Sequence, residues 1–252
     1  MHARLPTEAA TRDRLAVDIA EKGFATAQGG RTPVLEGLSF TLERGRFTCL
    51  VGPSGCGKTT TLRILLGLEP DYVGSIDPAF ARERVAAVFQ EPRLLPWRTL
   101  EENVRLALPA ELAGKDLAPL LDKVGLSEFR NAYPAELSLG MARRAALVRA
   151  FAIEPEILIL DEPFVSLDEP TANRLRAALA DLLAATPVTG LMVTHNLREA
   201  VALADRILVL TDRPARLADD VEIDRSAGKR TGSEADAFIR GLAERFPGLV
   251  GL

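Results

Sequence analysis

A glycine-rich stretch at residues 52–60 carries the clearest chemistry in the sequence, which is phosphate binding. It has the form G-x-x-x-x-G-K-T and consists of Gly52, Pro53, Ser54, Gly55, Cys56, Gly57, Lys58, Thr59 and Thr60. The glycines of such a loop let successive backbone N–H groups converge on phosphate oxygens. Lys58 supplies a compact charge for the β- and γ-phosphates, and the Thr59 hydroxyl is placed to bind Mg²⁺. The sequence therefore predicts a site for a nucleoside triphosphate.

The segments on either side of this loop have the sequence patterns of a strand and a helix, which is the context in which a phosphate loop occurs. Residues 46–51 form an apolar run that predicts a buried strand, and residues 60–66 are expected to form a helix. The N-terminus of that helix would add its positive end to the site. An ordinary glycine-rich turn before a helix is the alternative, which the complete motif in a strand–loop–helix context disfavours.

Two acidic residues follow a second apolar strand. Residues 157–160 are a continuous hydrophobic run, typical of a parallel strand covered on both faces, and Asp161 and Glu162 come directly after it. Asp161 is placed to reach Mg²⁺, directly or through water. Glu162 can polarise a water molecule for attack on phosphate. A solvated acidic turn is the alternative, and the phosphate loop elsewhere in the chain makes it less favourable.

Strands and helices are expected to alternate around these motifs. The expected strands are residues 15–24, 34–42, 46–51, 85–89, 157–160, 188–194 and 206–210. The expected helices are residues 60–66, 101–108, 117–124, 139–152, 171–185, 197–204 and 233 to about 246. The pattern predicts an α/β fold with a parallel sheet, preceded by short antiparallel strands. Residues 91–152 are expected to form a helical insertion, and residues 1–14 a disordered tail.

Composition limits the classes of function. The net charge of −4 argues against nucleic acid as the main partner, because surfaces that follow a phosphate backbone are usually basic. No apolar run reaches the roughly 20 residues of a membrane helix, so we expect a soluble protein. Cys49 and Cys56 are too few for a metal cage or a disulfide framework. A reactive thiol at Cys56 is the less favoured interpretation of that residue.

Taken together, the motifs resemble those of the ATP-binding cassette (ABC) ATPases over about residues 15–217. Residues 137–141, L-S-L-G-M, stand where the family has its signature L-S-G-G-Q; Leu139 and Met141 depart from it, whereas Ser138 and Gly140 are kept. The resemblance implies a P-loop nucleoside triphosphatase with a RecA-like parallel-sheet core, an N-terminal antiparallel β subdomain and an inserted α-helical subdomain. A C-terminal extension with a helix, residues 218–252, would follow the ATPase domain.

The resemblance also implies roles for residues outside the phosphate loop. Gln90 is similar to the Q-loop glutamine at Mg²⁺, Asp168 to the D-loop aspartate, and His195 to the switch histidine at the γ-phosphate. Catalysis is then expected from Glu162, His195 and Gln90, with Mg²⁺ bound by Thr59, Gln90 and Asp161. Phe24 stands where the family stacks an aromatic ring on adenine, although a core aromatic explains it almost as well.

A second copy of the chain is expected to complete the site. In the family the signature faces the γ-phosphate held by the partner's phosphate loop, so that two ATP molecules lie within a head-to-tail homodimer. Ser138 would offer a hydroxyl group and Gly140 a close backbone approach, and Asp168 would link the two sites. Leu139 adds bulk at a position where the family has little, so the geometry or rate of closure could differ.

A longer string indicates the branch of the family. Residues 89–100, F-Q-E-P-R-L-L-P-W-R-T-L, followed by Asn103 and Val104, resemble importers of the nitrate/sulfonate/taurine group. This resemblance implies an ATP-hydrolysing subunit, using ATP and Mg²⁺, that lies peripherally at the cytoplasmic face of the cell (inner) membrane. Its partners would be integral permease subunits and, indirectly, a periplasmic or extracellular solute-binding protein, with no nucleic acid.

The surface that receives the permease is expected in the same string. Leu94, Leu95 and Trp97 would line the groove, and packing of these residues within the helical block is an equally open alternative. Two other functions are weighed against import. An ATPase of a lipid-handling ABC system is the alternative in the same class, and a soluble non-transport ABC protein is disfavoured by the single cassette and the acidic charge.

Overall fold

The computed structural model describes residues 13–27, 29–223 and 233–246. The chain divides into two units, residues 1–82 with 189–252 and residues 83–188. Each unit is described separately below. The tail expected at residues 1–14 falls mainly outside the described residues, and the first strand begins at Arg14.

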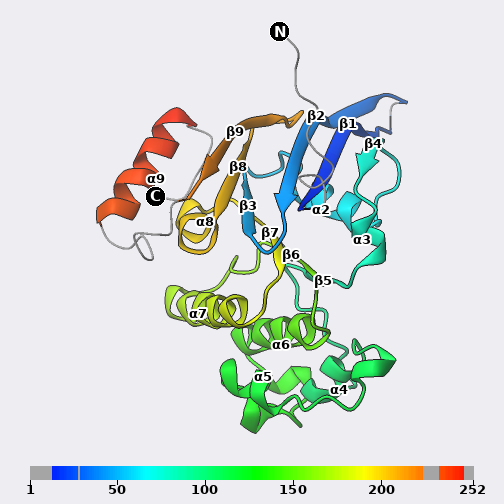
Figure 1. Cartoon of the computed structure of the whole chain (residues 1–252), viewed down its shortest axis with the longest axis vertical. Helices are drawn as coiled ribbons and strands as arrows, with labels where there is room; N and C mark the ends of the chain where they lie inside the picture. The colour runs from blue at the N-terminus through cyan, green and yellow to red at the C-terminus, as the bar shows by residue number, and fades with distance from the viewer. Residues whose placement is uncertain (1–12, 28, 224–232, 247–252) are drawn as a thin grey trace. The chain divides into compact units, whose positions relative to one another are not determined.

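The first unit contains an antiparallel sheet of three strands in the order β2-β1-β4 (Figure 1). These strands are β1 (Arg14–Ala25), β2 (Arg31–Glu43) and β4 (Val73–Ile76). Leu15, Val17 and Ile19 are buried and alternate with exposed neighbours, as the sequence predicts. The short strand β4 was not predicted, because its residues are mostly exposed and show no apolar alternation.

The alternation along β1 changes in its second half. The pairing of β1 with β4 shifts between Ile19 and Glu21, and its pairing with β2 shifts between Lys22 and Gly23. Such irregularities move later side chains to the opposite face of a strand. Consequently Lys22 is buried although the earlier alternation would place it in solvent.

The parallel strands of the first unit surround β3 (Phe47–Val51). It pairs with β7 (Thr189–Thr194) on one side and with β8 (Arg206–Leu210) on the other. Every residue of these three strands is buried, which explains their continuous apolar sequences. The helices of this unit are α2 (Lys58–Leu65), α3 (Ala79–Arg82), α8 (Leu197–Leu203) and α9 (Ser233–Arg245).

One strand of this unit, β9 (Leu217–Glu222), lies mostly beyond residue 217, where the sequence predicted the end of the ATPase domain. It runs antiparallel to β8, within the segment expected to be a C-terminal extension. Its sequence, LADDVE, contains three acidic residues, so hydrophobicity gives little signal of a strand. Its acidic side chains instead pair with arginines, as shown below.

The second unit combines two parallel strands with a group of helices. The strands are β5 (Val85–Val88) and β6 (Ile157–Asp161). The helices are α4 (Leu100–Arg105), α5 (Ala118–Lys123), α6 (Leu139–Ala152) and α7 (Glu169–Ala185), with short 3-10 turns at Ala110–Leu112, Ser127–Phe129 and Pro134–Glu136. α6 packs against α4, α5 and α7 and is the central helix of the unit.

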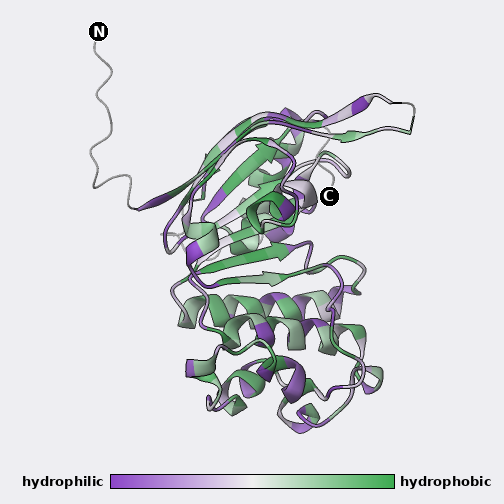
Figure 2. Ribbon diagram, turned by 90° about the vertical axis from the view of Figure 1, so that its right-hand side faces the viewer, coloured by the Kyte–Doolittle hydropathy of each residue, from purple (hydrophilic) through white to green (hydrophobic). Residues whose placement is uncertain are grey.

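The described elements confirm the predicted α/β character of the chain. Hydrophobic residues predominate in the strands that cross the middle of the view in Figure 2, and polar residues are frequent in the loops. No helix within the described ranges is long and apolar enough to cross a membrane.

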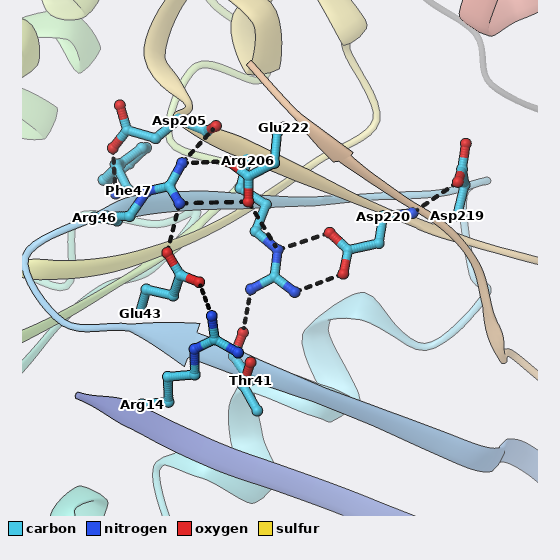
Figure 3. A network of polar contacts seen from close by, with 10 residues as sticks. All are labelled: Arg14, Thr41, Glu43, Arg46, Phe47, Asp205, Arg206, Asp219, Asp220 and Glu222. Carbon is cyan, nitrogen blue, oxygen red and sulfur yellow. Dashed lines mark hydrogen bonds and ion pairs between the residues drawn. The ribbon is translucent and has the colours of Figure 1, made fainter. Parts of the chain in front are cut away.

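A network of ion pairs joins four strands of the first unit (Figure 3). Arg206, at the start of β8, binds both carboxylate oxygens of Asp220 on β9, with its Nε 2.7 Å from Oδ1. The same guanidinium donates to the carbonyl oxygen of Thr41 on β2 at 2.8 Å. Because Arg206 is buried, these partners are needed to compensate for the loss of water around its charge.

Arg46, just before β3, extends this network. Its guanidinium pairs with Glu43 at the end of β2 and with Glu222 at the end of β9. The carboxylate of Asp205 accepts a hydrogen bond from the backbone N–H of Phe47 at 2.7 Å. The hydrogen bond from Arg46 holds the pKa of the Glu43 carboxyl below its ordinary value.

We expect Glu43→Gln to lower the free energy of unfolding at pH 7 by less than about 1 kcal/mol, because the pair lies near the surface. The pKa of Glu43 is lower in the folded chain, so its stabilisation is present above the unfolded pKa of about 4.3 and is lost as the pH falls through the folded value. The difference between wild type and variant should therefore shrink below about pH 4 in urea titrations. A difference that stays constant from pH 7 to pH 3 would contradict this assignment.

Candidate active site

The phosphate loop connects β3 to α2 and depends on glycine at two close contacts. A Cβ atom at Gly57 would lie 2.6 Å from Leu35 Cδ2, and the φ of Gly57 is +129°, which other residues rarely adopt. A Cβ atom at Gly52 would lie 2.9 Å from Cys56 Sγ and 3.0 Å from Leu210 Cβ. The loop is therefore packed against β2 and the end of β8, and larger residues at these positions would displace it.

Lys58 lies within the loop rather than in solvent. Its side chain is 4% exposed, and Nζ donates to the carbonyl oxygens of Gly52 at 2.8 Å and Pro53 at 2.9 Å. α2 begins at Lys58, and its N-cap Gly57 has no side chain to cap the helix. The ammonium group and the N-terminus of a helix thus meet at one loop, an arrangement that binds phosphate groups.

Cys56 is buried in the same loop and does not have the environment of a reactive thiol. Burial raises the pKa of the Cys56 thiol, and the nearby Lys58 offsets this only in part. Since the thiolate is the reactive form, the structure disfavours the alternative of a regulatory cysteine here.

Phe24 and His195 are the other candidate residues of the first unit. Phe24, near the end of β1, is 41% exposed, so the alternative of a core aromatic does not hold. His195 follows β7 directly and precedes Asn196, the N-cap of α8. The Asn196 side chain accepts hydrogen bonds from the N–H groups of Arg198 and Glu199, which fixes the backbone beside the histidine.

The acidic pair lies at the end of β6 in the second unit. Asp161 is 9% exposed and closes the fully buried strand. Glu162 has φ +44°, a left-handed conformation that is uncommon for residues other than glycine. The chain therefore bends at Glu162, directly after Asp161, and such backbone geometry is concentrated at functional sites.

The signature segment and the D-loop each begin a helix. Ser138 is the N-cap of α6, and its side chain accepts a hydrogen bond from Met141 N at 3.3 Å. Asp168 is the N-cap of α7 and accepts from Thr171 N at 3.1 Å. Hydrogen bonding from Thr171 lowers the pKa of the Asp168 carboxyl, so this group is ionised at neutral pH.

A close contact joins the two helix starts. A Cβ atom at Gly140 would lie 2.4 Å from Thr171 Cγ2. Gly140 therefore has a packing role in addition to the backbone approach expected from the resemblance. The neighbouring departure, Leu139, is 46% exposed, so its bulk does not disturb the interior of the second unit.

Gln90 follows β5 and is exposed at the start of a loop that α6 holds in place. Arg149 on α6 donates to the carbonyl oxygens of Pro92 and Arg93, both at 2.8 Å. Arg93 has φ +49°, and its guanidinium carbon lies 3.9 Å from the centre of the Phe89 ring. Sequence reasoning missed Arg149, because an arginine within a helix resembles an ordinary surface residue until its partners are known.

Asn103 organises the next part of that loop. It is buried, its amide donates to the carbonyl oxygens of Leu95, Arg98 and Thr99, and its Oδ1 accepts from Leu95 N at 2.7 Å. Trp97, within this turn, is 69% exposed, so it does not pack inside the helical block.

The candidate residues are thus divided between the units. The phosphate loop, Phe24 and His195 belong to the first unit, and Gln90, Asp161, Glu162, the signature and the D-loop belong to the second. Within the described ranges, no group of three or more His, Cys, Asp or Glu side chains could hold a metal ion alone.

Comparison with known proteins identifies the family. Residues 35–165 match the family described as ABC transporter. The chain belongs to the ABC transporter family. It is 42% identical to "Aliphatic sulfonates import ATP-binding protein SsuB 2" of Burkholderia cenocepacia (strain HI2424), over 87% of this chain and 82% of that protein. It is also 42% identical to "Aliphatic sulfonates import ATP-binding protein SsuB 1" of Pseudomonas syringae pv. tomato (strain ATCC BAA-871 / DC3000), over 89% and 80% of the two chains.

Solved structures of ATP-binding cassettes share the fold. The dimeric post-hydrolysis state of the cassette MJ0796 bound to ADP and Pi superposes with a TM-score of 0.70 at 25% identity, covering 83% of this chain and 99% of that one. The ATP-binding subunit of another ABC transporter gives 0.69 at 30% identity, covering 90% and 98%. These similarities confirm the predicted ABC ATPase fold, and this ABC chain is an ATP-binding, ATP-hydrolysing subunit.

Gly140→Ala should lower the free energy of unfolding by about 1–3 kcal/mol, because the added Cβ overlaps the Thr171 methyl group. Thr171→Ser removes that methyl group, so the double variant should regain most of the loss. Gly241→Ala, where nothing lies within 4 Å of the added atom, is the matched control and should not destabilise. Chemical denaturation gives the free energy of unfolding of the wild type, Gly140→Ala, the Gly140→Ala/Thr171→Ser double variant and Gly241→Ala. Equal stability of Gly140→Ala and the double variant would refute the contact.

Proposed function

We propose that the chain is the ATP-hydrolysing subunit of an importer for aliphatic sulfonates. The observation that carries the proposal is its 42% identity, over most of both chains, to import ATP-binding proteins named for these solutes. The formed phosphate loop with its buried lysine supports the ATPase part of the proposal. Nitrate and taurine, which the sequence resemblance left open, are alternative outcomes of the uptake test. We prefer import to a lipid-handling or soluble non-transport role because these relatives are named as import proteins.

We assign the hydrolytic step to the phosphate loop together with Glu162, His195 and Gln90. Residues 52–60 bind the triphosphate, with the Lys58 ammonium countering charge on the β- and γ-phosphates. Glu162 accepts a proton from the attacking water, and His195 and Gln90 hold the water and γ-phosphate in position. The bend of the chain at Glu162, directly after Asp161, supports separate roles for these carboxylates.

Mg²⁺ fits the oxygen-donor chemistry of Thr59, Asp161 and Gln90. Mg²⁺ is usually held by one or two protein oxygens together with phosphate groups, and the described residues contain no cluster that would replace those phosphates. Bound there, the ion would neutralise negative charge on the phosphates. The chain's own contribution is to orient the hydroxyl, carboxylate and amide oxygens.

A second copy of the chain completes the site in this proposal. Ser138 and Gly140 begin α6, whose N-terminus favours a phosphate group of the partner's ATP. The similarity to a dimeric cassette with bound ADP and Pi supports this assembly. Asp168, ionised at the start of α7, would connect the two sites.

Membrane contact comes through other chains. We propose integral permease subunits as direct partners and an extracytoplasmic solute-binding protein as an indirect one, with this chain peripheral at the cytoplasmic face of the inner membrane. The exposed Trp97, on a turn fixed by Asn103, is the proposed permease contact together with Leu94 and Leu95. A large aromatic side chain is typical of the residues that dominate such interfaces.

Glu162→Gln is expected to reduce ATP hydrolysis by at least about 100-fold, since the amide cannot accept the proton. Binding of ATP should be retained, because Lys58 and the loop are unchanged. Phosphate release and equilibrium nucleotide binding, measured on the same preparation with Mg²⁺, separate the two effects. Undiminished hydrolysis would refute the role of Glu162 as the general base.

Growth and uptake assays test the solute. Deletion of the gene should abolish uptake of radiolabelled short aliphatic sulfonates, and wild-type protein, but not Glu162→Gln, should restore it. Uptake of nitrate and of taurine, an amino-substituted sulfonate, is measured in the same strains for comparison. Loss of nitrate or taurine uptake with normal uptake of unsubstituted alkanesulfonates would make that solute the substrate and leave the ATPase assignment standing.

Trp97→Ala should decrease solute uptake at least about fivefold because it removes an aromatic anchor of the interface. ATP hydrolysis by the isolated subunit should not change, since Trp97 is exposed and outside the phosphate loop. Val73→Ala removes a comparably exposed apolar side chain, 58% exposed, from the other unit and should leave uptake unchanged. Normal uptake by the Trp97 variant would refute the docking assignment.

A further inference from the structure

Lys22 is a buried charged residue in the first unit, and it has no role in the hydrolytic step proposed above. Its side chain is 1% exposed, and Nζ donates to Glu69 Oε1 at 2.7 Å and to the carbonyl oxygen of Asp71 at 2.5 Å. Nζ also lies 4.5 Å from the centre of the Phe24 ring. Burial of an ammonium group is unfavourable unless partners compensate, so this side chain is held in one place.

The backbone of β1 creates the pairing of Lys22 with Phe24. The register shift between Ile19 and Glu21 turns Lys22 to the buried side. The later shift between Lys22 and Gly23 adds a residue to β2 and not to β1, so Lys22 and Phe24, two apart in β1, lie on the same face. Gly23 between them cannot carry a side chain without displacement, because a Cβ atom would lie 2.8 Å from the carbonyl oxygen of Thr32. The strand therefore brings the ammonium group against the ring and leaves no third side chain between them.

The ring has two different surroundings. One face meets the buried ammonium group, which attracts the ring electrons in a cation–π contact. Yet Phe24 is 41% exposed, so the rest of the ring meets solvent. An oriented, exposed aromatic surface is suited to stacking with a planar heterocycle.

Lys22 also connects this ring to the segment that follows α2, the helix after the phosphate loop. Glu69 lies in the segment that leaves α2, the helix that begins with Lys58. Arg31 on β2 binds Asp71 in the same segment, with 3.2 Å between Nη2 and Oδ2. One ammonium group therefore fixes Phe24 to the segment that follows the phosphate-loop helix.

We propose that Lys22 is a positioning residue for the nucleobase of ATP. Its ammonium group, held by Glu69, fixes the Phe24 ring in the orientation against which the base stacks, while the phosphate loop binds the triphosphate. This inference rests on the proposed role of Phe24 in nucleotide binding. It predicts that loss of Lys22 weakens binding of ligands with a base and leaves binding of the phosphates alone unchanged.

The test compares ATP with inorganic tripolyphosphate, which has no base, by calorimetry on the full chain in EDTA so that hydrolysis does not occur. Lys22→Met should weaken ATP binding about 3- to 10-fold and change tripolyphosphate binding less than about twofold. Phe24→Ala should have the same selective effect, and the double variant should be no weaker than Phe24→Ala alone. Lys22→Arg, which keeps a cation on the ring, should restore most of the affinity.

Lys115→Met removes another ion-paired lysine, in the second unit, and is the matched control; it should leave both affinities unchanged. Equal loss of both ligands in Lys22→Met, or unchanged ATP binding, would overturn the proposal. If Lys22→Met does not fold, Glu69→Gln is the second variant: it should weaken ATP selectively by about two- to threefold, and an unchanged ratio of affinities would be equally decisive against the proposal. Wild-type protein that binds neither ligand would refute the proposed ATPase function itself, whereas equal wild-type affinity for both would refute only the base contact.

Discussion

The buried ammonium group of Lys58 is the interaction on which the rest of the first unit depends. A charge that is 4% exposed must be surrounded by oxygen, and the carbonyl groups of Gly52 and Pro53 supply two such contacts. Those carbonyls converge because β3 ends at Val51, and because glycine allows the loop to pack against Leu35 and Leu210. The fully buried strands on both sides of β3 hold this geometry rigid. The arrangement holds the ammonium group inside the loop, next to the N-terminus of α2.

The second unit is organised differently, around one helix. Ser138, in the segment that resembles the family signature, is the N-cap of α6, and later along its length the helix holds two segments that carry candidate residues. Arg143 donates to the carbonyl oxygen of Pro163, just beyond the acidic pair, and Arg149 holds the loop after Gln90. The start of the same helix packs against α7 through Gly140 and Thr171. A displacement of α6 would therefore move residues 137–141, the segment after Glu162 and the loop after Gln90 together. Such joint movement would suit a subunit that couples ATP hydrolysis to transport.

Local patterns in the sequence predicted the elements that carry the candidate site but not the contacts that support them. The phosphate loop, the apolar strands β3, β6 and β7, and helix α6 have strong local patterns, so their type and approximate limits could be derived. β9 could not, because its acidic residues are explained only by Arg46 and Arg206 of other strands. Lys22 and Arg149 were missed for the same reason, since their roles come from partners distant in sequence. Gly140 was linked to phosphate, whereas its contact with Thr171 required coordinates.

The most direct test of the account is ATP binding by Lys58→Arg, measured by calorimetry beside the wild type and Lys58→Met. A planar guanidinium cannot replace a point charge between two carbonyl groups in a closed loop, so arginine should not rescue binding despite keeping the charge. We predict that both variants lose at least about tenfold in affinity while remaining folded by circular dichroism. Wild-type affinity in Lys58→Arg would contradict the claim that the geometry of the loop around this ammonium group, rather than positive charge alone, creates the nucleotide site.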